Sequence, residues 1–399
     1  MTMQSYRVLV VDDQPFQREY LMNLFRERGV EHLAGASDGA AALRCLQQEE
    51  FDLVLSDLMM PGMDGVQMIQ QLSRQKRRPR LALMSSASRR MMVSAGMVAQ
   101  SLGMSMIDLL PKPVLPASIG RLLTRLDNSF RQVVTPGADP HRYDRAVLHE
   151  AIETGQMQAW FQAKKSLASG RIVGAEALLR WLTPAHDVLL PGRFMDDLED
   201  HGLQERLLWH MLEQTIEAQA SWREGGYEVP VSVNLPTQLL DSPDLPDRLA
   251  KFVADHGARA CALCFELTEN STTKNLSSYY AGACRLRMKG FGLAQDDYGQ
   301  GYSSLFNLVS TPFTELKIDR SLVHGCVEDA NLSAAVASSI DMGRQLHVDV
   351  VAEGVETSEE LSLLRRMGCD RAQGFLISEA VTPQAFLQQL REDGPGVAR

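Results

Sequence analysis

Short apolar runs alternate with helical stretches along the first third of the chain. Five of these runs are predicted to be strands: Arg7–Val11, His32–Ala36, Asp52–Ser56, Arg80–Ser85 and Ile107–Leu110. Strands that alternate with helices usually pair in parallel, because each helix carries the chain back to the same edge of the sheet. Residues 1–126 are therefore predicted to form an α/β domain with a doubly wound, five-stranded parallel sheet.

The rest of the chain carries eight further strand candidates, most of them separated by helical stretches. They are Trp160–Ala163, Ile172–Leu179, Val229–Leu235, Leu263–Leu267, Gly290–Gln295, Glu315–Asp319, Val348–Ala352 and Arg371–Leu376. Eight strands within about 250 residues match a single (β/α)8 barrel of the TIM type, which we place at residues 145–399. Only about eight residues separate the first two strands, too few for a parallel crossover, so we expect an antiparallel first strand.

The segment between the two predicted domains, residues 127–144, is rich in polar and turn-forming residues. It contains Thr135-Pro136-Gly137-Ala138-Asp139-Pro140, and a helix is expected from Arg142 onward. Prolines stiffen a connector, because each fixes one backbone dihedral angle. We therefore interpret this segment as a linker with some stiffness, able to carry a signal between the domains.

The composition and net charge limit the kinds of molecule that we expect the protein to bind. The 399 residues are 45% hydrophobic and 23% charged, and the formal net charge of −10 disfavours broad DNA binding, which needs a basic excess. We interpret the basic cluster Lys76–Arg80 as a solvated loop. No apolar run approaches the roughly 20 residues that span a bilayer, and the N-terminus lacks a signal-peptide pattern. We therefore expect a cytoplasmic protein without direct DNA or membrane binding.

Six cysteines are few for this length, which is typical of reduced thiols. Cys261 and Cys264 have the spacing of a metal or redox pair, but no second pair accompanies them, and Cys264 runs into a predicted strand. We therefore interpret both as structural thiols.

Polar and charged residues stand at the ends of four N-terminal strands. Asp12 and Asp13 follow the first strand, Asp57 the third, Ser86 the fourth and Lys112 the fifth. In a doubly wound sheet these ends meet in one crevice, where three carboxylates repel one another unless a hard cation such as Mg²⁺ binds. A carboxylate beside Mg²⁺ and a lysine can accept a phosphoryl group as an acyl phosphate. Each aspartate alone could be a helix cap, but the whole set predicts a phosphoacceptor site.

This constellation resembles the receiver domain of bacterial response regulators, which has a flavodoxin-like fold, over residues 6–126. The resemblance implies that Asp57 is the phosphoacceptor, that Asp12 and Asp13 hold one Mg²⁺, that Ser86 is the switch hydroxyl and that Lys112 pairs with the phosphate. It also implies a sensor histidine kinase or phosphotransfer protein as partner. Lys112-Pro113 matches a family step at which a cis peptide bond is common. Leu109 departs from the family, which often has an aromatic switch residue at this position.

Groups able to hold a metal ion recur at the ends of successive barrel strands. They are Glu176, Asn234, Glu266, Asp296 and Asp297. A β/α barrel gathers its strand ends at one face, so residues far apart in sequence can share one site. An all-oxygen ligand set suits Mg²⁺ or Mn²⁺ and disfavours zinc. The adjacent Asp296 and Asp297 could address two ions about 3.5–4 Å apart, which would favour hydrolysis of a phosphate ester.

Two further charged residues belong to this pattern. Lys317 offers a point charge to the phosphate or to the attacking water. Glu353 is a candidate general base or additional metal ligand, and the sequence does not separate these roles. The segment Asp296–Ser304 contains two glycines and two serines and is expected to form a mobile loop that gates the site, with a plain surface turn as the alternative.

Over residues 145–390 the chain resembles the EAL-domain family of cyclic-di-GMP phosphodiesterases. The resemblance rests on Asn234, the 296–304 loop and the runs Glu176-Ala177-Leu178-Leu179-Arg180, Glu266-Leu267-Thr268-Glu269, Lys317-Ile318-Asp319, Glu353-Gly354-Val355-Glu356-Thr357 and Gln373-Gly374-Phe375. It implies a first metal held by Glu176, Asn234, Glu266 and Asp296, a second served by Asp296 and Asp297, and a water activated by Glu353. It further implies that Glu269 anchors the mobile loop. The residues that it implies for the dinucleotide cleft are Gln162, Leu178, Arg180, Asp319, Glu356 and Gln373.

The chain departs mildly from this family at three places. Ala163 follows Gln162 where proline is usual, and Pro236 stands two residues after Asn234 where a small polar residue is common. Glu379-Ala380 replaces a basic residue and proline after the last strand. None of these changes removes a proposed ligand, so we find no reason in the sequence for an inactive barrel.

These patterns lead to the hypothesis of a two-component response regulator that hydrolyses cyclic-di-GMP to 5'-pGpG by metal-assisted attack of water, under the control of receiver phosphorylation. One alternative is a barrel that binds the dinucleotide without cutting it. The complete ligand set disfavours it, because such receptors generally lack one or more ligands or the base. A second alternative is a phosphorylation-dependent adaptor that binds another protein. By resemblance we also expect a homo-oligomer, while the direction of control by phosphorylation stays open.

Overall fold

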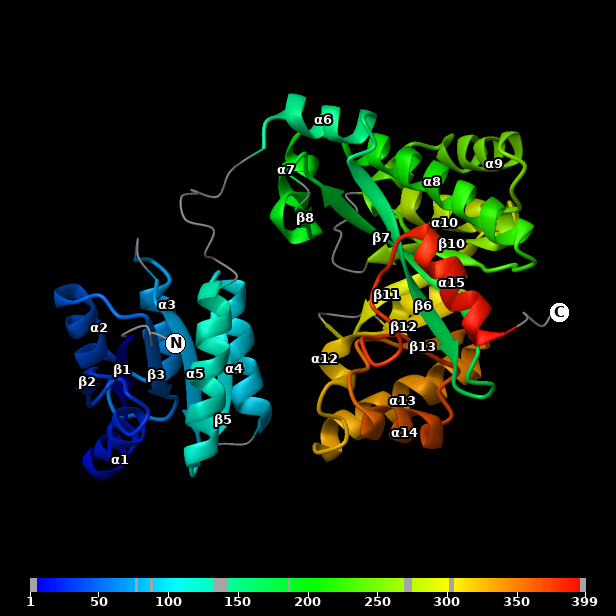
Figure 1. The fold of residues 1–399 in the computed structure, drawn as a ribbon. Coiled ribbons are helices and arrows are strands. Elements are labelled where there is room, and N and C mark those ends of the chain that lie inside the picture. Colours follow the sequence, from blue (N-terminus) through cyan, green and yellow to red (C-terminus); the bar gives the residue numbers. More distant parts are fainter. Residues whose placement is uncertain are drawn as a thin grey trace. The chain divides into compact units, whose positions relative to one another are not determined.

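The computed structural model of the chain describes residues 6–75, 78–86, 89–131, 143–185, 187–268, 275–300 and 305–394. The chain divides into two compact units, residues 1–140 and residues 141–399 (Figure 1). Each unit has its own buried hydrophobic cores, so each has the anatomy of a separate domain.

The N-terminal unit is a five-stranded parallel sheet with helices on both faces. Its strands are β1 (Arg7–Val11), β2 (His32–Ala36), β3 (Leu53–Asp57), β4 (Arg80–Ser85) and β5 (Met106–Pro111). Its helices are α1 (Pro15–Arg26), α2 (Gly39–Gln48), α3 (Gly65–Leu72), α4 (Arg89–Ser101) and α5 (Pro116–Arg131). The strand order β2-β1-β3-β4-β5, parallel throughout, confirms the predicted doubly wound, flavodoxin-like sheet.

Alternate residues of β1 supply the cores on the two faces of this sheet. Val8 and Val10 belong to a core that includes Phe25 of α1. Leu9 and Val11 belong to the other core, which includes buried residues of α2, α3 and α4. Because β1 is buried on both faces, its sequence is a continuous apolar run, and this is why the strand is easily predicted.

Helix α5 extends to Arg131, beyond the boundary at residue 126 that the sequence suggested. Its Phe130 ring stacks on Tyr6 with ring centroids 5.5 Å apart, and the Arg80 guanidinium lies 3.5 Å from the Phe130 centroid. Aromatic and cation–π contacts of this kind stabilise the last turn of the helix. The expectation of a solvated loop is therefore wrong for Arg80, which begins β4, while residues 76–77 lie outside the described part of the chain.

The C-terminal unit is a barrel closed by eight strands (Figure 1). Around the ring they are β6 (Met157–Ser166), β14 (Arg371–Ala372), β13 (Asp349–Ala352), β12 (Glu315–Ile318), β11 (Gly292–Tyr298), β10 (Leu263–Thr268), β9 (Val231–Asn234) and β7 (Ile172–Leu182). Strand β6 is antiparallel to both of its neighbours, β7 and β14, whereas the other pairs in the ring are parallel. This confirms the modified TIM-type barrel with an antiparallel first strand.

Helices surround this barrel and pack on its outer face. They are α6 (Arg145–Glu153), α7 (Met195–Asp200), α8 (Gln204–Glu224), α9 (Leu245–Asp255), α10 (Leu276–Met288), α11 (Leu305–Ser310), α12 (Arg320–Val323), α13 (Ala330–Leu346), α14 (Ser358–Met367) and α15 (Pro383–Asp393). Short 3-10 helices cover Pro191–Arg193, Thr237–Asp241 and Ala260–Ala262. The Trp222 ring of α8 packs against Phe161 of β6 and Phe386 of α15, with centroids 4.9 and 4.7 Å away, and so ties both helices to the first strand.

Two details of the strand pattern differ from the prediction. The sequence missed β8 (Val188–Leu189), a two-residue strand that pairs antiparallel with the end of β7 outside the ring. The predicted strand Arg371–Leu376 ends at Ala372, because the chain then turns onto the backbone of Val355. Gly374 makes this turn possible, since a β-carbon there would lie 2.2 Å from the Val355 nitrogen.

In the described part of the chain, no helix combines the length and hydrophobicity needed to cross a membrane. All six cysteines are free thiols. Burial raises the pKa of Cys264 to about 12, so this thiol stays uncharged at neutral pH and is a poor metal ligand. This supports the structural role predicted for Cys264.

Candidate functional site

The predicted acidic residues of the N-terminal unit converge at the carboxyl ends of β1 and β3. One carboxylate oxygen each of Asp12, Asp13 and Asp57 lies within 4.8 Å of the others. Lys112 Nζ lies 2.8 Å from Asp12 Oδ2 and 2.5 Å from Asp57 Oδ2. Burial lowers the pKa of Lys112, but the two carboxylates outweigh burial and raise it overall. The lysine thus offsets the repulsion between buried acids, and the cluster has the oxygen ligands that suit Mg²⁺.

The other predicted receiver residues lie at neighbouring positions. Ser86 directly follows β4 and is exposed, and Lys112 directly follows β5 with a cis bond to Pro113. Leu109 of β5 is half-buried and faces Gly96 of α4, where an added β-carbon would lie 3.6 Å from the leucine methyl carbons. The switch role of Ser86 and the effect of Leu109 stay predictions.

In the barrel, Lys317 of β12 is the hub of the predicted metal site. Its Nζ lies 2.8 Å from Glu266 Oε2, Asp296 Oδ1 and Glu353 Oε1, and 3.2 Å from Glu176 Oε2. Lys317 is 1% exposed, so its charge is enclosed by these four carboxylates. The structure therefore brings together residues from β7, β10, β11, β12 and the residue after β13, spread over about 180 positions of the chain.

The carboxyl groups of this cluster differ in pKa, because burial and the neighbouring charges act on each of them to a different extent. Burial, with the charge of Glu266 added, raises the pKa of Glu176 to about 7. Burial also raises the pKa of Glu353 well above its usual range, although Lys317 acts in the opposite sense. For Glu266, Lys317 and Lys164 outweigh burial and lower the pKa to about 2. Glu266 is therefore charged at neutral pH, whereas Glu176 can take up a proton near neutral pH, and burial favours the uncharged form of Glu353.

Asp296 and Asp297 reach the same cluster because β11 is irregular. Side chains of a regular strand alternate between its two faces. Here the register of β11 against β12 shifts between Gln295 and Tyr298, and Asp297 has a left-handed φ of 55°. One oxygen each of Asp296, Asp297 and Glu353 lies within 4.8 Å of the others. The expectation that the acidic pair follows its strand is wrong, because the bulge places the pair within β11.

The last two predicted metal ligands, Asp297 and Asn234, lie at the rim of the barrel. Burial, followed by the charge of Asp296, raises the pKa of Asp297 to about 6. Asn234 ends β9, is exposed, and lies in register with Glu266 of the adjacent strand. Carboxylates and a side-chain amide are the donors that Mg²⁺ and Mn²⁺ prefer, so the residues present fit such ions.

Two predicted cleft residues, Gln373 and Gln162, are buried, and Gln373 holds the first predicted ligand, Glu176. Gln373 Nε2 donates to Gln162 Oε1 at 2.8 Å and to Glu176 Oε2 at 2.7 Å. Gln162 in turn donates to the Ser378 carbonyl oxygen at 2.9 Å. These bonds fix the orientation of Glu176, and contact of either glutamine with a dinucleotide stays a prediction.

The remaining predicted cleft residues are more scattered. Leu178 and Arg180 are half-buried and Glu356 is exposed. Asp319 is buried and caps α12, accepting a 2.8 Å hydrogen bond from the Ser321 backbone nitrogen. Their substrate contacts stay predictions. Glu269 and residues 301–304 of the predicted gating loop lie outside the described residues.

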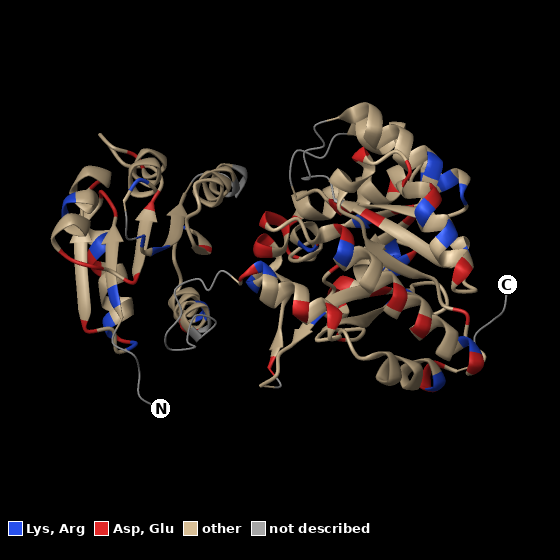
Figure 2. Ribbon diagram, turned by 90° about the horizontal axis from the view of Figure 1, so that it is seen from above, with Lys and Arg blue, Asp and Glu red and all other residues tan. Residues whose placement is uncertain are grey.

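The sequence reasoning missed Lys164, which is buried beside the site. Its Nζ lies 2.5 Å from Glu315 Oε1, 2.7 Å from Ser232 Oγ and 3.2 Å from Glu266 Oε1. A signal was present, because Lys164 stands two residues after Gln162 and so shares its face of β6. Figure 2 shows that basic and acidic residues are also intermixed around the outside of the barrel unit, so charge alone does not single out this lysine.

Comparison with known proteins agrees with both halves of this description. Residues 145–380 match the model of the EAL domain, and residues 8–124 match that of the response regulator receiver domain. The match to the EAL domain covers more than half of the chain, and the two matched regions lie in the two units of the structure.

Similar proteins include one that matches over nearly the whole length of both chains. Cyclic di-GMP phosphodiesterase RocR of Pseudomonas aeruginosa is 29% identical over 392 residues, which are 96% of this chain and 98% of RocR. The bifunctional diguanylate cyclase/cyclic di-GMP phosphodiesterase MucR of the same species is 32% identical over 241 residues, 60% of this chain but 35% of MucR. A solved structure of the PaMucR phosphodiesterase in complex with c-di-GMP matches with a TM-score of 0.57 and 32% identity, covering 60% of this chain and 97% of that one.

Proposed function

The chain belongs to the EAL domain family, and from this premise we propose that it is a response regulator that hydrolyses cyclic di-GMP to 5'-pGpG under the control of its receiver domain. The observation that carries this proposal is the cluster of Glu176, Glu266, Asp296 and Glu353 around the buried Lys317. Four carboxylates at one barrel rim suit the binding of divalent cations, which stabilise the negative charge that develops on a phosphodiester. The full-length similarity to RocR supports the same substrate.

Two divalent cations, Mg²⁺ or Mn²⁺, would be held by this set. Glu176, Asn234, Glu266 and Asp296 would take the first, and Asp296 with Asp297 would take the second, as their positions at the rim support. When bound, such ions polarise the phosphoryl oxygens and lower the pKa of water.

Two side chains of the protein have separate roles in the reaction. Glu353, whose pKa is raised by burial, accepts the proton of the attacking water. Lys317 places a positive charge beside the phosphate and keeps the acids at one locus. The water oxygen forms a bond to phosphorus, the bond from phosphorus to the 3' oxygen breaks, and that oxygen takes up a proton. Opening one of the two diester bonds of the ring leaves the linear dinucleotide with a 5' phosphate.

Control is proposed to act through Asp57. This carboxylate is 5% exposed, lies at the end of β3 beside Asp12, Asp13 and Lys112, and would form an acyl phosphate with one Mg²⁺ bound. A sensor histidine kinase or phosphotransfer protein would supply the phosphoryl group. The added charge would then bias a two-state element of the receiver, with Ser86 as the hydroxyl that responds.

Two further features of the described residues support proposals on assembly and location. Helix α11 exposes three large apolar residues, Leu305, Phe306 and Val309, which supports a homo-oligomer formed through an apolar surface. Six free cysteines support a reducing compartment, the cytoplasm.

The first test is turnover of cyclic di-GMP with Mg²⁺ or Mn²⁺, followed by chromatography of pGpG, with and without the phosphoryl mimic beryllofluoride. We expect metal-dependent formation of pGpG and a change in rate when beryllofluoride is added. Glu176→Ala should abolish turnover, and full activity of that variant would remove Glu176 from the site. Tight binding without product would instead identify a receptor of the dinucleotide.

A further inference from the structure

A line of paired charges runs through the barrel from the site toward its opposite end, buried at Glu266, Lys164 and Glu315 and exposed at Asp349. We call it the charge ladder, and in order its members are Glu266, Lys164, Glu315, Arg371 and Asp349. Lys164 Nζ contacts Glu266 Oε1 at 3.2 Å and Glu315 Oε1 at 2.5 Å. Arg371 then contacts Glu315 Oε2 at 2.9 Å and Asp349 Oδ2 at 2.6 Å. Opposite charges alternate at each step, so each cation of the ladder lies between two carboxylates.

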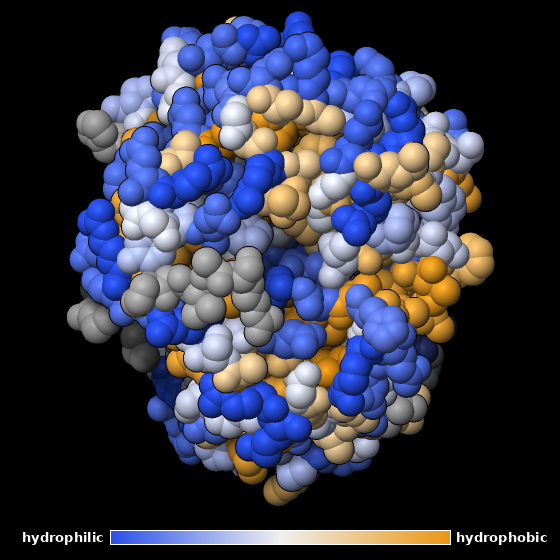
Figure 3. Space-filling view, turned by 90° about the vertical axis from the view of Figure 1, so that its right-hand side faces the viewer, coloured by the Kyte–Doolittle hydropathy of each residue, from blue (hydrophilic) through white to orange (hydrophobic). Residues whose placement is uncertain are grey.

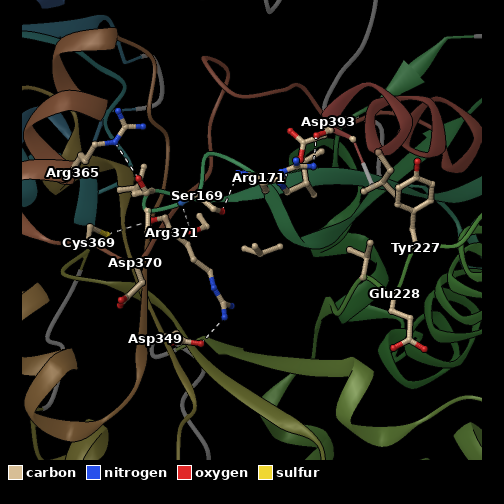
Figure 4. Close-up of a pocket in the computed structure, with 18 of the residues that line it drawn as sticks. Ser169, Arg171, Tyr227, Glu228, Asp349, Arg365, Cys369, Asp370, Arg371 and Asp393 are labelled. Atoms are coloured by element: carbon tan, nitrogen blue, oxygen red, sulfur yellow. Dashed lines mark hydrogen bonds and ion pairs between the residues drawn. The ribbon is translucent and has the colours of Figure 1, made fainter. Parts of the chain in front are cut away.

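The outer end of the ladder opens into a cavity of about 830 Å³. Arg371 and Asp349, the first residues of β14 and β13, line this cavity and form an ion pair there (Figure 4). These strand starts lie at the end of the barrel away from the metal-ligand residues. Figure 3, turned to show the side of the molecule that lies at the right in Figure 1, has a hollow near its centre with both hydrophilic and hydrophobic residues around it. Water and dissolved ions can therefore reach Arg371 but not Lys164, whose side chain is 2% exposed.

Two lysines divide the two oxygens of Glu266 between them. Lys164 lies 3.2 Å from Oε1, and Lys317 lies 2.8 Å from Oε2. Glu266 is itself fully buried, and both of its carboxylate oxygens lie beside a lysine. An oxygen engaged by Lys164 cannot rotate toward the site, and the other oxygen is thereby directed to the cluster around Lys317.

Burying the charged side chain of Lys164 costs free energy, which indicates that the position of this charge inside the barrel matters. A lysine without counter-charges is expensive to bury, and here burial is outweighed by Glu315 and Glu266, so the pKa of Lys164 is raised and the group stays charged. A hydrophobic residue would fill the same space in the barrel without this network. Ser232 Oγ, 2.7 Å from Nζ, adds a hydrogen bond that fixes the ammonium group.

We propose that Lys164 is a positioning residue that orients Glu266 for divalent-cation binding, and that Glu315 and Arg371 hold Lys164 in place. This inference rests on the proposed metal-dependent hydrolysis only for its catalytic consequence. Its direct consequence is for cation affinity, which can be measured without substrate.

The test uses Mn²⁺ alone as the probe on the full chain, with free Mn²⁺ followed by electron paramagnetic resonance. Lys164→Met keeps the length of the side chain and removes its charge. The double variant Lys164→Met with Glu315→Gln removes one charge of each sign, and so preserves the balance should the single variant fail to fold. Lys165→Met is the matched control, because Lys165 is the next residue on β6 and instead pairs with Asp393. The receiver site is identical in all variants, so differences belong to the barrel.

We expect the Mn²⁺ dissociation constant of the barrel to rise about 10–100-fold in the Lys164 variants, the range seen when an outer partner of a metal ligand is lost. With cyclic di-GMP, kcat should fall while KM stays within about threefold, since Lys164 does not touch substrate. Lys165→Met should match the wild type in both. A folded Lys164 variant with wild-type Mn²⁺ affinity would overturn the proposal. Lack of hydrolysis by the wild type would instead reject the proposed function and leave the Mn²⁺ comparison valid.

Discussion

Lys317 Nζ lies 2.8 Å from Glu353 Oε1, and this pair joins β12 to the residue that follows β13. The contact places the proposed base beside Lys317, the cation that contacts all four carboxylates. Burial raises the pKa of Glu353, while Lys317 favours its charged form. The pair therefore sets how readily Glu353 takes a proton from water.

Removal of this base should affect the chemical step and spare binding. For Glu353→Gln we expect kcat to fall about 10²–10⁴-fold, the usual contribution of a general base. Affinity for cyclic di-GMP, measured by calorimetry, should change far less, because the side chain keeps its size. Glu359→Gln, at an exposed position of α14, is the control and should leave both unchanged. A parallel loss of binding would instead indicate that Glu353 acts mainly as a ligand.

The affinity of the barrel for Mn²⁺ should depend on pH through Glu176. Its pKa is raised by burial to about 7, so the carboxylate is charged above that pH and takes up a proton below it. Metal binding requires the charged form, so affinity should be full above about pH 7 and fall by up to about tenfold per pH unit below it. Asp297, with a pKa raised to about 6, should steepen the fall below that pH. Affinity that is constant between about pH 5.5 and about pH 8.5 would contradict this prediction.

The receiver should lose stability when Lys112 is replaced. Lys112→Met leaves Asp12 and Asp57 buried without their shared cation, which typically costs about 3–5 kcal/mol. We expect this loss in the unfolding free energy of the N-terminal unit in a chelator, and partial recovery when Mg²⁺ is added. Arg44→Met, at an exposed position of α2, should change stability by less than about 0.5 kcal/mol. Equal stability of Lys112→Met and the wild type would show that the three acids do not need this charge.

Control of turnover by the receiver should depend on one carboxylate, that of Asp57. Asp57→Asn should remove any change in turnover caused by beryllofluoride and keep the basal rate, because an amide cannot form the acyl-phosphate mimic. Asp64→Asn is the matched control, since Asp64 caps α3 and asparagine is an equally good cap. A beryllofluoride response that persists in Asp57→Asn would separate the receiver from barrel control.

The linear pattern of the chain was sufficient for the fold class and for Asp12 and Asp13 at the end of β1. The buried part of β1, Val8 to Val11, is a continuous apolar run, and the two residues that follow it stand out because they are charged. The short connection between β6 and β7 was sufficient for the antiparallel first strand, since chain length alone forbids a parallel crossover.

Only the tertiary structure decided how these residues meet. The bulge in β11 and the left-handed backbone of Asp297 bring two sequential acids to one side of the strand, which no strand periodicity predicts. Gln373 turned out to hold Glu176 by a hydrogen bond, and Gln162 accepts a second hydrogen bond from Gln373. Lys164, Glu315 and Arg371 form pairs between strands that are 56 and 151 positions apart in sequence. Periodicity reports which face a residue occupies, but the partner across a closed barrel depends on strand order, register and tilt, and these arise only when the ring closes.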